Sequence, residues 1–144
     1  MYGLLDIATS GMVAQRQRLD VISSNLANQD AILDSKGEVN PYRRRIPVFQ
    51  VGAASGAGSA GGRNYGVRMA KIELDNAPPA LGAFDPSNPL AYKTGPNKGY
   101  VARSSISSVV ENINAMEAMR AYEANVMAAD ISKQMVASAL RLIA

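Results

Sequence analysis

Three consecutive arginines, Arg43, Arg44 and Arg45, are the side chains of this sequence best suited to bind a charged ligand. Guanidinium groups bind phosphate and carboxylate, so such a run could contact nucleic acid or an acidic protein surface. No aromatic residue lies among them, and a solvated strand edge or a salt-bridging partner surface accounts for them better. We therefore expect no nucleic-acid binding. A helical scaffold that binds acidic partners through Arg43–Arg45 remains a less favoured alternative.

Other residue types that carry out catalysis or bind metals are scarce. The chain has no cysteine and no histidine, which excludes thiol nucleophiles, disulfides and zinc sites with those ligands. The commonest general base is therefore also missing. Asp30, Asp34 and Glu38 lack the spacing of a calcium-binding loop, and the glycines of residues 52–62 lack the phosphate-loop pattern. We expect no catalytic residue, no bound metal, no cofactor and no enzymatic activity.

The first 28 residues predict one helix, over residues 4–28. Apolar residues recur there in alternating steps of three and four, the heptad spacing of helices that pack in a coiled coil. These positions are Leu5, Ala8, Met12, Gln15, Leu19, Ile22 and Leu26, with only Gln15 polar. Asn28, Gln29 and Asp30 are suited to end the helix.

The last third predicts a longer helix. Ser108-Val109-Val110-Glu111 matches a capping box, and neither proline nor glycine follows before Leu142. Two adjacent apolar stripes follow. The first consists of Ile113, Met116, Met119, Tyr122, Val126, Ala129, Val136, Leu140 and Ile143. The second consists of Ala128, Ile131, Met135, Ala139 and Leu142. So broad an apolar band needs partners on more than one side. The frequent alanines permit close helix approach. We therefore expect contacts with other subunits.

The middle of the chain predicts a small β insert. Strand-like runs occupy Arg44–Val51, Tyr65–Leu74 and Tyr100–Arg103, and the low-complexity stretch 52–62 predicts a flexible spacer. The expected fold is mainly α with a short β-rich insert between two helices that pack as an elongated coiled coil. Its expected parts are residues 1–28, 29–105 and 106–144.

The expected interface follows the two helices. We expect subunit contacts at Leu5, Met12, Leu19, Ile22, Leu26, Met116, Met119, Tyr122, Val126, Met135, Val136 and Leu140. No apolar run of 18 residues occurs, so we expect no membrane span. The start of the sequence lacks a basic region before its apolar residues, so we expect no cleaved signal peptide.

Two motifs at opposite ends of the chain indicate a family. The segment from Ser10 to Asn28, with Ser24, Asn25, Leu26, Ala27 and Asn28 at its end, resembles the amino-terminal signature of flagellar rod and hook proteins. The run from Arg120 to Val126, with Tyr122 and Asn125, resembles their carboxy-terminal motif. Within that family, the segments Pro41–Arg45, Phe84–Pro89 and Gly99–Val101 resemble the FlgC family of proximal rod proteins, and so does the short length of 144 residues.

The resemblance implies a structural subunit of the flagellar basal-body rod. Such a subunit would leave the cytoplasm through the flagellar type III export apparatus without a cleaved signal peptide. In the periplasm it would polymerise with itself and with other rod proteins, namely proximal and distal rod subunits and the rod–export-gate adaptor. The product would be a helical drive shaft that carries motor torque to the hook, with the terminal helices forming its inner wall. Another axial rod or adaptor protein of the same family is the alternative.

Overall fold

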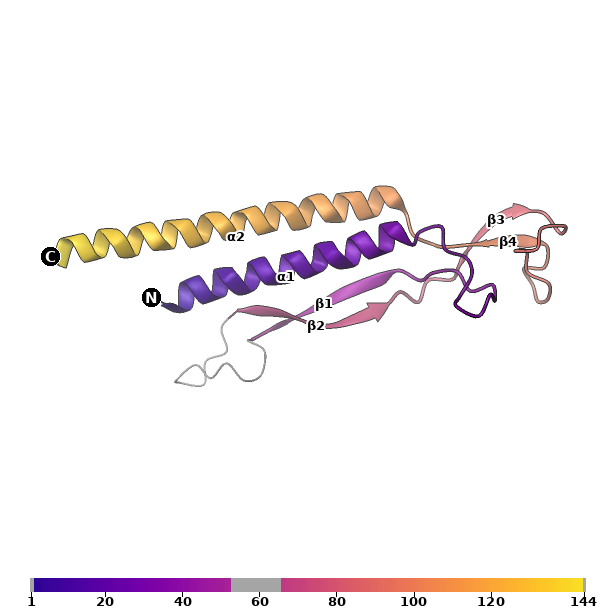
Figure 1. The fold of residues 1–144 in the computed structure, drawn as a ribbon, viewed down its shortest axis with the longest axis horizontal. Helices are drawn as coiled ribbons and strands as arrows, with labels where there is room; N and C mark the ends of the chain where they lie inside the picture. Colours follow the sequence, from indigo (N-terminus) through magenta and orange to yellow (C-terminus); the bar gives the residue numbers. More distant parts are fainter. Residues whose placement is uncertain (1, 53–65, 144) are drawn as a thin grey trace. The chain divides into compact units, whose positions relative to one another are not determined.

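The computed structural model describes residues 2–52 and 66–143. Two long helices enclose four short strands in chain order (Figure 1). The elements are α1 (Tyr2–Ala27), β1 (Arg45–Val51), β2 (Val67–Leu74), β3 (Ala80–Phe84), β4 (Tyr100–Arg103) and α2 (Ser108–Ile143). The predicted mainly α fold with a small β insert is confirmed, and the strands of the insert are antiparallel. Apart from Gly52, the predicted spacer at 52–62 lies outside the described residues.

Both helices were predicted from their periodicity, but the start of α2 differs from the prediction. At the end of α1, the carbonyl of Ser24 accepts hydrogen bonds from the Asn28 backbone at 3.2 Å and from its side chain at 2.8 Å. At the start of α2, the carbonyl of Ser107 accepts the Glu111 N–H at 3.0 Å, which makes Ser107 the N-cap residue. The predicted capping box is therefore wrong, because the Glu111 side chain binds elsewhere.

The strands form two separate two-stranded sheets, β1–β2 and β3–β4. In the first sheet, hydrogen bonds join Asp75 to Arg44 at one end and Gly52 to Gly66 at the other, so the strands are antiparallel. β3 was not predicted, because its five residues lie between turn-forming prolines and contain Gly82. That glycine permits the antiparallel pairing, since a Cβ there would lie 3.1 Å from the Val101 carbonyl oxygen.

The chain forms two compact units, and each helix contributes residues to both. Unit 1 consists of Met1–Asp20, Pro47–Ile72 and Asn114–Ala144, and unit 2 consists of Val21–Ile46 and Glu73–Ile113.

The helices of unit 1 meet through small side chains. The buried residues that α1 and α2 contribute to unit 1 are Ala8, Gly11, Ala14, Ala118, Ala129 and Ser132. Gly11 lies so close to Asn125 that an added Cβ would be 2.8 Å from that amide. Further along α1, Arg18 pairs with Glu117 at 3.2 Å. Because the α2 partner number falls from 125 to 117 as the α1 number rises from 11 to 18, the two helices run antiparallel within this unit (Figure 1).

Unit 2 combines a small apolar core with buried polar groups. Val21, Ile22, Ala91 and Ala102 are its buried hydrophobic residues, among those that the structure describes. Phe84 of β3 and Tyr100 of β4 pack edge to face, with ring centroids 5.1 Å apart. Asn25, Ser104 and Glu111 are buried as well, so hydrogen bonds must compensate for their desolvation.

Candidate functional site

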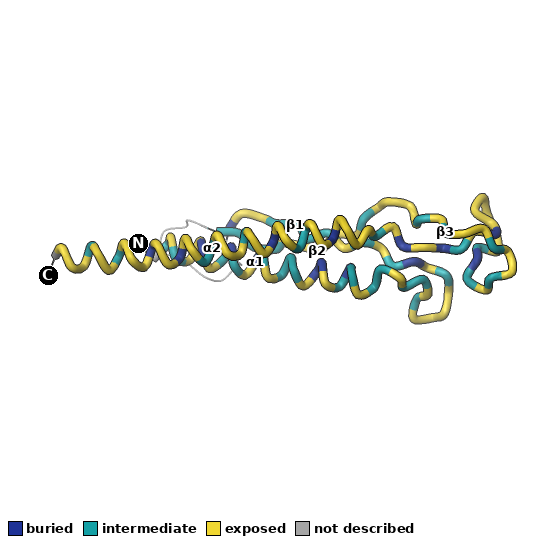
Figure 2. Tube along the Cα trace, turned by 90° about the horizontal axis from the view of Figure 1, so that it is seen from above, coloured by how far each residue is buried: buried dark blue, intermediate teal, exposed yellow. Residues whose placement is uncertain are grey.

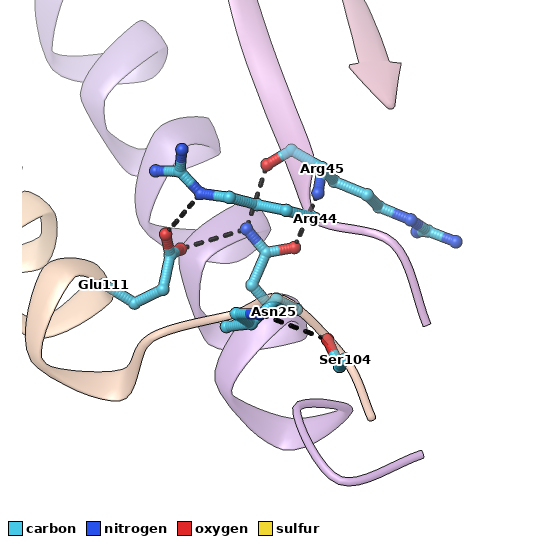
Figure 3. A network of polar contacts seen from close by, with 6 residues as sticks. Asn25, Arg44, Arg45, Ser104 and Glu111 are labelled. Atoms are coloured by element: carbon cyan, nitrogen blue, oxygen red, sulfur yellow. Dashed lines mark hydrogen bonds and ion pairs between the residues drawn. The ribbon is translucent and has the colours of Figure 1, made fainter. Parts of the chain in front are cut away.

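A buried polar cluster in unit 2 joins α1, β1 and α2 (Figure 3). The Asn25 side-chain amide donates to the Glu111 carboxylate and to the Arg45 carbonyl, both at 2.9 Å. Its oxygen accepts the Arg45 N–H, also at 2.9 Å. Arg44 Nε donates to the other Glu111 oxygen at 2.7 Å. Every oxygen and nitrogen of the Asn25 amide therefore has a partner from another element.

The members of the cluster depend on one another for compensation of their buried polar groups. Glu111 and Asn25 are each 1% exposed, so an unpaired charge or amide there would be costly. Arg44 supplies the opposite charge, and its side chain remains 29% exposed. Glu111 also lies in the first turn of α2, where the partial positive charge of the helix N-terminus favours a carboxylate. Removing one partner would leave the others desolvated and unmatched.

The arginine run is occupied by contacts within unit 2. Arg43 donates to the Asp75 carbonyl at 2.6 and 3.0 Å and to Asn76 at 2.9 Å. Arg44 binds Glu111, as described above. The Arg45 guanidinium lies over the Tyr42 ring, 5.5 Å from its centroid. Because each arginine has a separate internal partner, the run is accounted for without an acidic ligand.

A broad apolar surface of α2 lies exposed on the side opposite its buried residues in unit 1. We call it the outer face. Its apolar members are Met116, Ala124, Met127, Ile131, Met135 and Leu142. The large ones are each more than half exposed, from 52% at Met116 to 89% at Leu142. Arg120 and Ser138 complete the outer face, and Figure 2 shows how much of α2 is exposed along its length.

The expected interface residues have different environments in the structure. Ile22 is buried within unit 2. Six others are half-buried: Leu5, Met12, Leu19, Leu26, Val126 and Val136. Five on α2 are exposed: Met116, Met119, Tyr122, Met135 and Leu140.

The motif residues at the end of α1 contribute mainly to internal contacts. Asn25 is the centre of the polar cluster, Asn28 binds the last turn of α1, and Ser24 lies 3.3 Å from the Tyr42 hydroxyl. Leu26 is half-buried, and Ala27 ends α1 and is exposed. In the second motif, Asn125 lies against Gly11 and donates to the Ala121 carbonyl at 2.9 Å. Arg120 and Tyr122 are exposed.

Sequence reasoning named Glu111 and Arg44 but missed the contact between them, and it missed the close approach of Gly11 to Asn125. For Glu111 a signal existed, because it precedes Ala118, Asn125 and Ser132 at steps of seven, the spacing of the buried face of α2. The partners of Arg44 and Gly11 lie far away in the sequence, so no local pattern identifies them.

Neither metal binding nor membrane insertion is indicated by the described residues. They contain no group of three acidic residues placed to hold a metal ion. Asp34 instead accepts the backbone N–H groups of Lys36 and Glu38, which stabilises its own loop. Within the described part of the chain, neither helix combines the length and the apolar character that a membrane crossing requires.

Comparison with known proteins identifies the family. The family model described as "Flagella basal body rod protein" matches residues 5–30. FlgC, the flagellar basal-body rod protein of Escherichia coli O6:H1, is 40% identical over 142 residues, which cover 99% of this chain and 97% of that protein. FlgC of Salmonella typhimurium is 37% identical with the same coverage, and FlgC of Borreliella burgdorferi is 36% identical over 151 residues. The match extends over nearly the whole chain, and the chain belongs to the FlgC family of flagellar basal-body rod proteins.

Proposed function

We propose that this chain builds the wall of the rod by packing α1 and α2 among the helices of neighbouring subunits. As a member of its family it is a structural protein of the flagellar basal body and not an enzyme. One observation carries the proposal. The contact between α1 and α2 in unit 1 buries alanine, glycine and serine, whereas the large apolar side chains of α2 are exposed.

The exposed side chains give the energetic reason. Fully burying a Leu, Ile or Met side chain stabilises a structure by about 1.5–3 kcal/mol. Ile131, Met135 and Leu140 are each 57–64% exposed, so most of that stabilisation is absent from the single chain. Large contiguous apolar surfaces on soluble proteins mark interaction sites. Coverage by neighbouring helices would recover this free energy and couple subunit folding to assembly.

The neighbours would be copies of this chain and other rod proteins, namely proximal and distal rod subunits and the rod–export-gate adaptor. We further propose that the chain passes through the flagellar type III export apparatus, polymerises in the periplasm and forms part of a helical drive shaft. The helices would pack there as an elongated coiled coil. Small residues allow helix axes to approach closely, and a dense helical wall resists twisting, as torque transmission from motor to hook requires.

The proposal is tested by placing a charge on the exposed surface. Met135→Asp and Leu140→Asp alter side chains that are 64% and 62% exposed, so the subunit itself should fold normally. An unpaired carboxylate buried between subunits costs several kcal/mol, so rods should fail to form. Lys133→Ala is the matched control, since its side chain is 67% exposed on the same helix. Exported protein, basal bodies recovered with complete rods, and swimming are measured in a strain that lacks the chain. Normal rods and swimming with both aspartate variants would refute the proposal.

A further inference from the structure

The β3–β4 sheet of unit 2 presents an exposed aromatic ring on a well-fixed support. Phe84 remains 64% exposed although it packs edge to face on Tyr100. Gly99 lies directly against the ring, since a Cβ added there would be 2.6 Å from Phe84 Cε2. The φ of Gly99 is 87°, a conformation that favours glycine. The Asp85 N–H donates to the Gly99 carbonyl at 2.8 Å, which fixes the backbone beside the ring. Aromatic side chains held in this way are common anchors of protein interfaces.

The surroundings of the Phe84 ring are basic. Backbone hydrogen bonds of 3.0 Å join Tyr92 to Gly99 and Tyr100, which brings the loop residues Lys93 and Lys98 close to the ring. Both lysines are exposed, and neither side chain has a hydrogen bond or ion pair among the described residues. Segment 80–103 contains three basic residues and one acidic residue, Asp85, whose carboxylate accepts two hydrogen bonds from Ser87. We call Phe84, Tyr100, Lys93 and Lys98 the basic surface.

A second surface of unit 2 is a groove that can receive such a ring. The groove encloses about 350 Å³ and is lined by Leu33, Pro41, Tyr42 and Leu74 among others. Leu33 and Leu74 are 49% and 52% exposed. Pockets of about 300–1,000 Å³ hold small ligands, so the groove has room for one phenyl ring. Phe84 of the same chain does not line it.

The walls of the groove are fixed by hydrogen bonds. The Asn40 N–H donates to the Ile32 carbonyl at 2.8 Å, and the Tyr42 N–H donates to the Ala31 carbonyl at 2.9 Å. The Arg45 guanidinium lies over the Tyr42 ring, 5.5 Å from its centroid, and Arg45 is exposed. A guanidinium can stack on aromatic rings with both of its faces. An aromatic side chain entering the groove would therefore meet leucine, proline and a stacked arginine.

Acidic residues lie at one edge of the groove. Asp34 lines it, and the Asp34 N–H donates at 3.0 Å to the carbonyl of Glu38 across the same loop. Segment 30–40 contains three acidic residues and one basic residue, so its charge is opposite to that of segment 80–103. Arg43 also lines the groove, but its guanidinium is held by the Asp75 carbonyl and Asn76. Complementary charge around an apolar centre favours a specific protein contact.

We propose that Phe84 of one copy of this chain occupies the groove of a second copy, between Leu33 and Leu74, with Lys93 and Lys98 facing the edge formed by Asp34 and Glu38. This inference rests on the proposed function and specifies a contact between copies outside the two helices. Two different surfaces meet, so the contact is head to tail and leaves one surface of each kind free for the next copy.

Because the chain has no cysteine, introduced cysteines allow a direct test. Ser35 and Asn97 are exposed and lie beside the two surfaces. Rods that contain Ser35→Cys/Asn97→Cys as the only form of the chain are isolated and treated with a short bis-maleimide. The double variant should give covalent dimers and longer chains of this protein. Each single variant should give monomers only, because a head-to-tail contact brings together positions 35 and 97 and not two like positions.

Further substitutions in the double-cysteine chain test the ring and the groove. Phe84→Ala should lower the yield of cross-linked product at least about tenfold, as removal of an interface anchor does. Leu81→Ala is the matched control and should not change the yield, because Leu81 is 47% exposed on the same strand but lines a different cavity with Ser104 and Ser108. Leu33→Asp alters only the receiving groove and should lower the yield as much as Phe84→Ala. It keeps the test decisive if urea unfolding shows that purified Phe84→Ala does not fold.

The other outcomes separate this inference from the proposed function. Rods that contain the double-cysteine chain but give no cross-link between positions 35 and 97 would overturn the inference and leave the packing of the helices among subunits intact. Cross-linked dimers of either single variant would overturn the head-to-tail arrangement. Cross-links to a different protein in place of this chain would overturn the second copy as the partner. A yield unchanged by both Phe84→Ala and Leu33→Asp would overturn the seating of the ring in the groove.

Discussion

Replacing Asn25 by aspartate exchanges the amide nitrogen for an oxygen. Two hydrogen bonds within the polar cluster should thereby become repulsive contacts between oxygens. That nitrogen donates to the Glu111 carboxylate and the Arg45 carbonyl, both at 2.9 Å. The new oxygen cannot donate, and two carboxylates at that distance repel by about 6 kcal/mol at an effective dielectric constant of 20. The folded variant can avoid this repulsion by protonating the introduced carboxyl, which limits the decrease in its free energy of unfolding. At pH 7, protonating a carboxyl with an ordinary pKa of 3.9 costs about 4 kcal/mol.

The sign of the pH dependence follows from that escape. In the folded variant the pKa of the introduced carboxyl is raised, so the folded state holds a proton that the unfolded state has lost. Stability relative to the native sequence is therefore greatest near pH 4 and falls as pH rises, by about 1.4 kcal/mol per unit. Near pH 4 the free energy of unfolding is still about 1 kcal/mol lower than that of the native sequence, because the single O–H of a protonated carboxyl cannot replace the two N–H donors of the amide. By pH 7 the loss should approach about 5 kcal/mol.

Urea unfolding at pH 4 to 7 measures this loss, and hydrogen exchange reports it locally at the Arg45 N–H, which donates to Asn25 at 2.9 Å. Asn25→Ala is the control, because it removes the same hydrogen bonds without adding a charge. It should cost about 2–4 kcal/mol at every pH. A loss in Asn25→Asp that does not change with pH would refute the reasoning, and so would a loss smaller than that of the control at pH 7.

Four further variants test unit 1 and the predicted spacer at residues 52–62. Gly11→Ala should reduce the free energy of unfolding by about 1–3 kcal/mol, because the added Cβ would lie 2.8 Å from the Asn125 amide. A lower thermal unfolding temperature would show this loss. Gly3→Ala is the control, because a Cβ at that position meets nothing within 4 Å, and it should stabilise α1 by up to about 1 kcal/mol. If Gly3→Ala lost as much unfolding free energy as Gly11→Ala, the close contact of Gly11 with Asn125 would be contradicted. Arg18→Ala should cost less than about 1 kcal/mol in urea unfolding, because its ion pair lies on the surface, and a larger loss would contradict that assignment. Deleting Ser55–Ser59 should change stability by a few tenths of a kcal/mol and leave rod assembly intact, which recovery of basal bodies checks.

The sequence predicted the helices well and their buried faces poorly. Helix α2 was evident because no glycine or proline interrupts its 36 residues. Its inner face was missed because alanine and serine carry almost no burial signal, whereas methionine and leucine do. Met119 and Leu140 were assigned to contacts between subunits; they are exposed in the single chain, and that assignment stays a prediction.

The polar cluster shows a different limit of sequence reasoning. Asn25 was singled out as part of a motif, but its partners come from β1 and α2. Glu111 was assigned to a local cap because the capping pattern is short and common, whereas its true contact spans 86 positions. Strand β4 could be predicted from its composition, whereas β3 could not, because its pairing depends on Gly82 lying against Val101.

The long sequence separations of these contacts have a consequence for folding kinetics. Asn25 meets Glu111 across 86 positions in unit 2, and Arg18 meets Glu117 across 99 in unit 1. Contacts between distant residues slow folding, because a large loop must close before they form. Each unit also needs residues from both the first and the last third of the chain. If the chain is exported one end first, as proposed above, neither unit can form before the other end arrives, and the chain would stay unfolded until export is nearly complete.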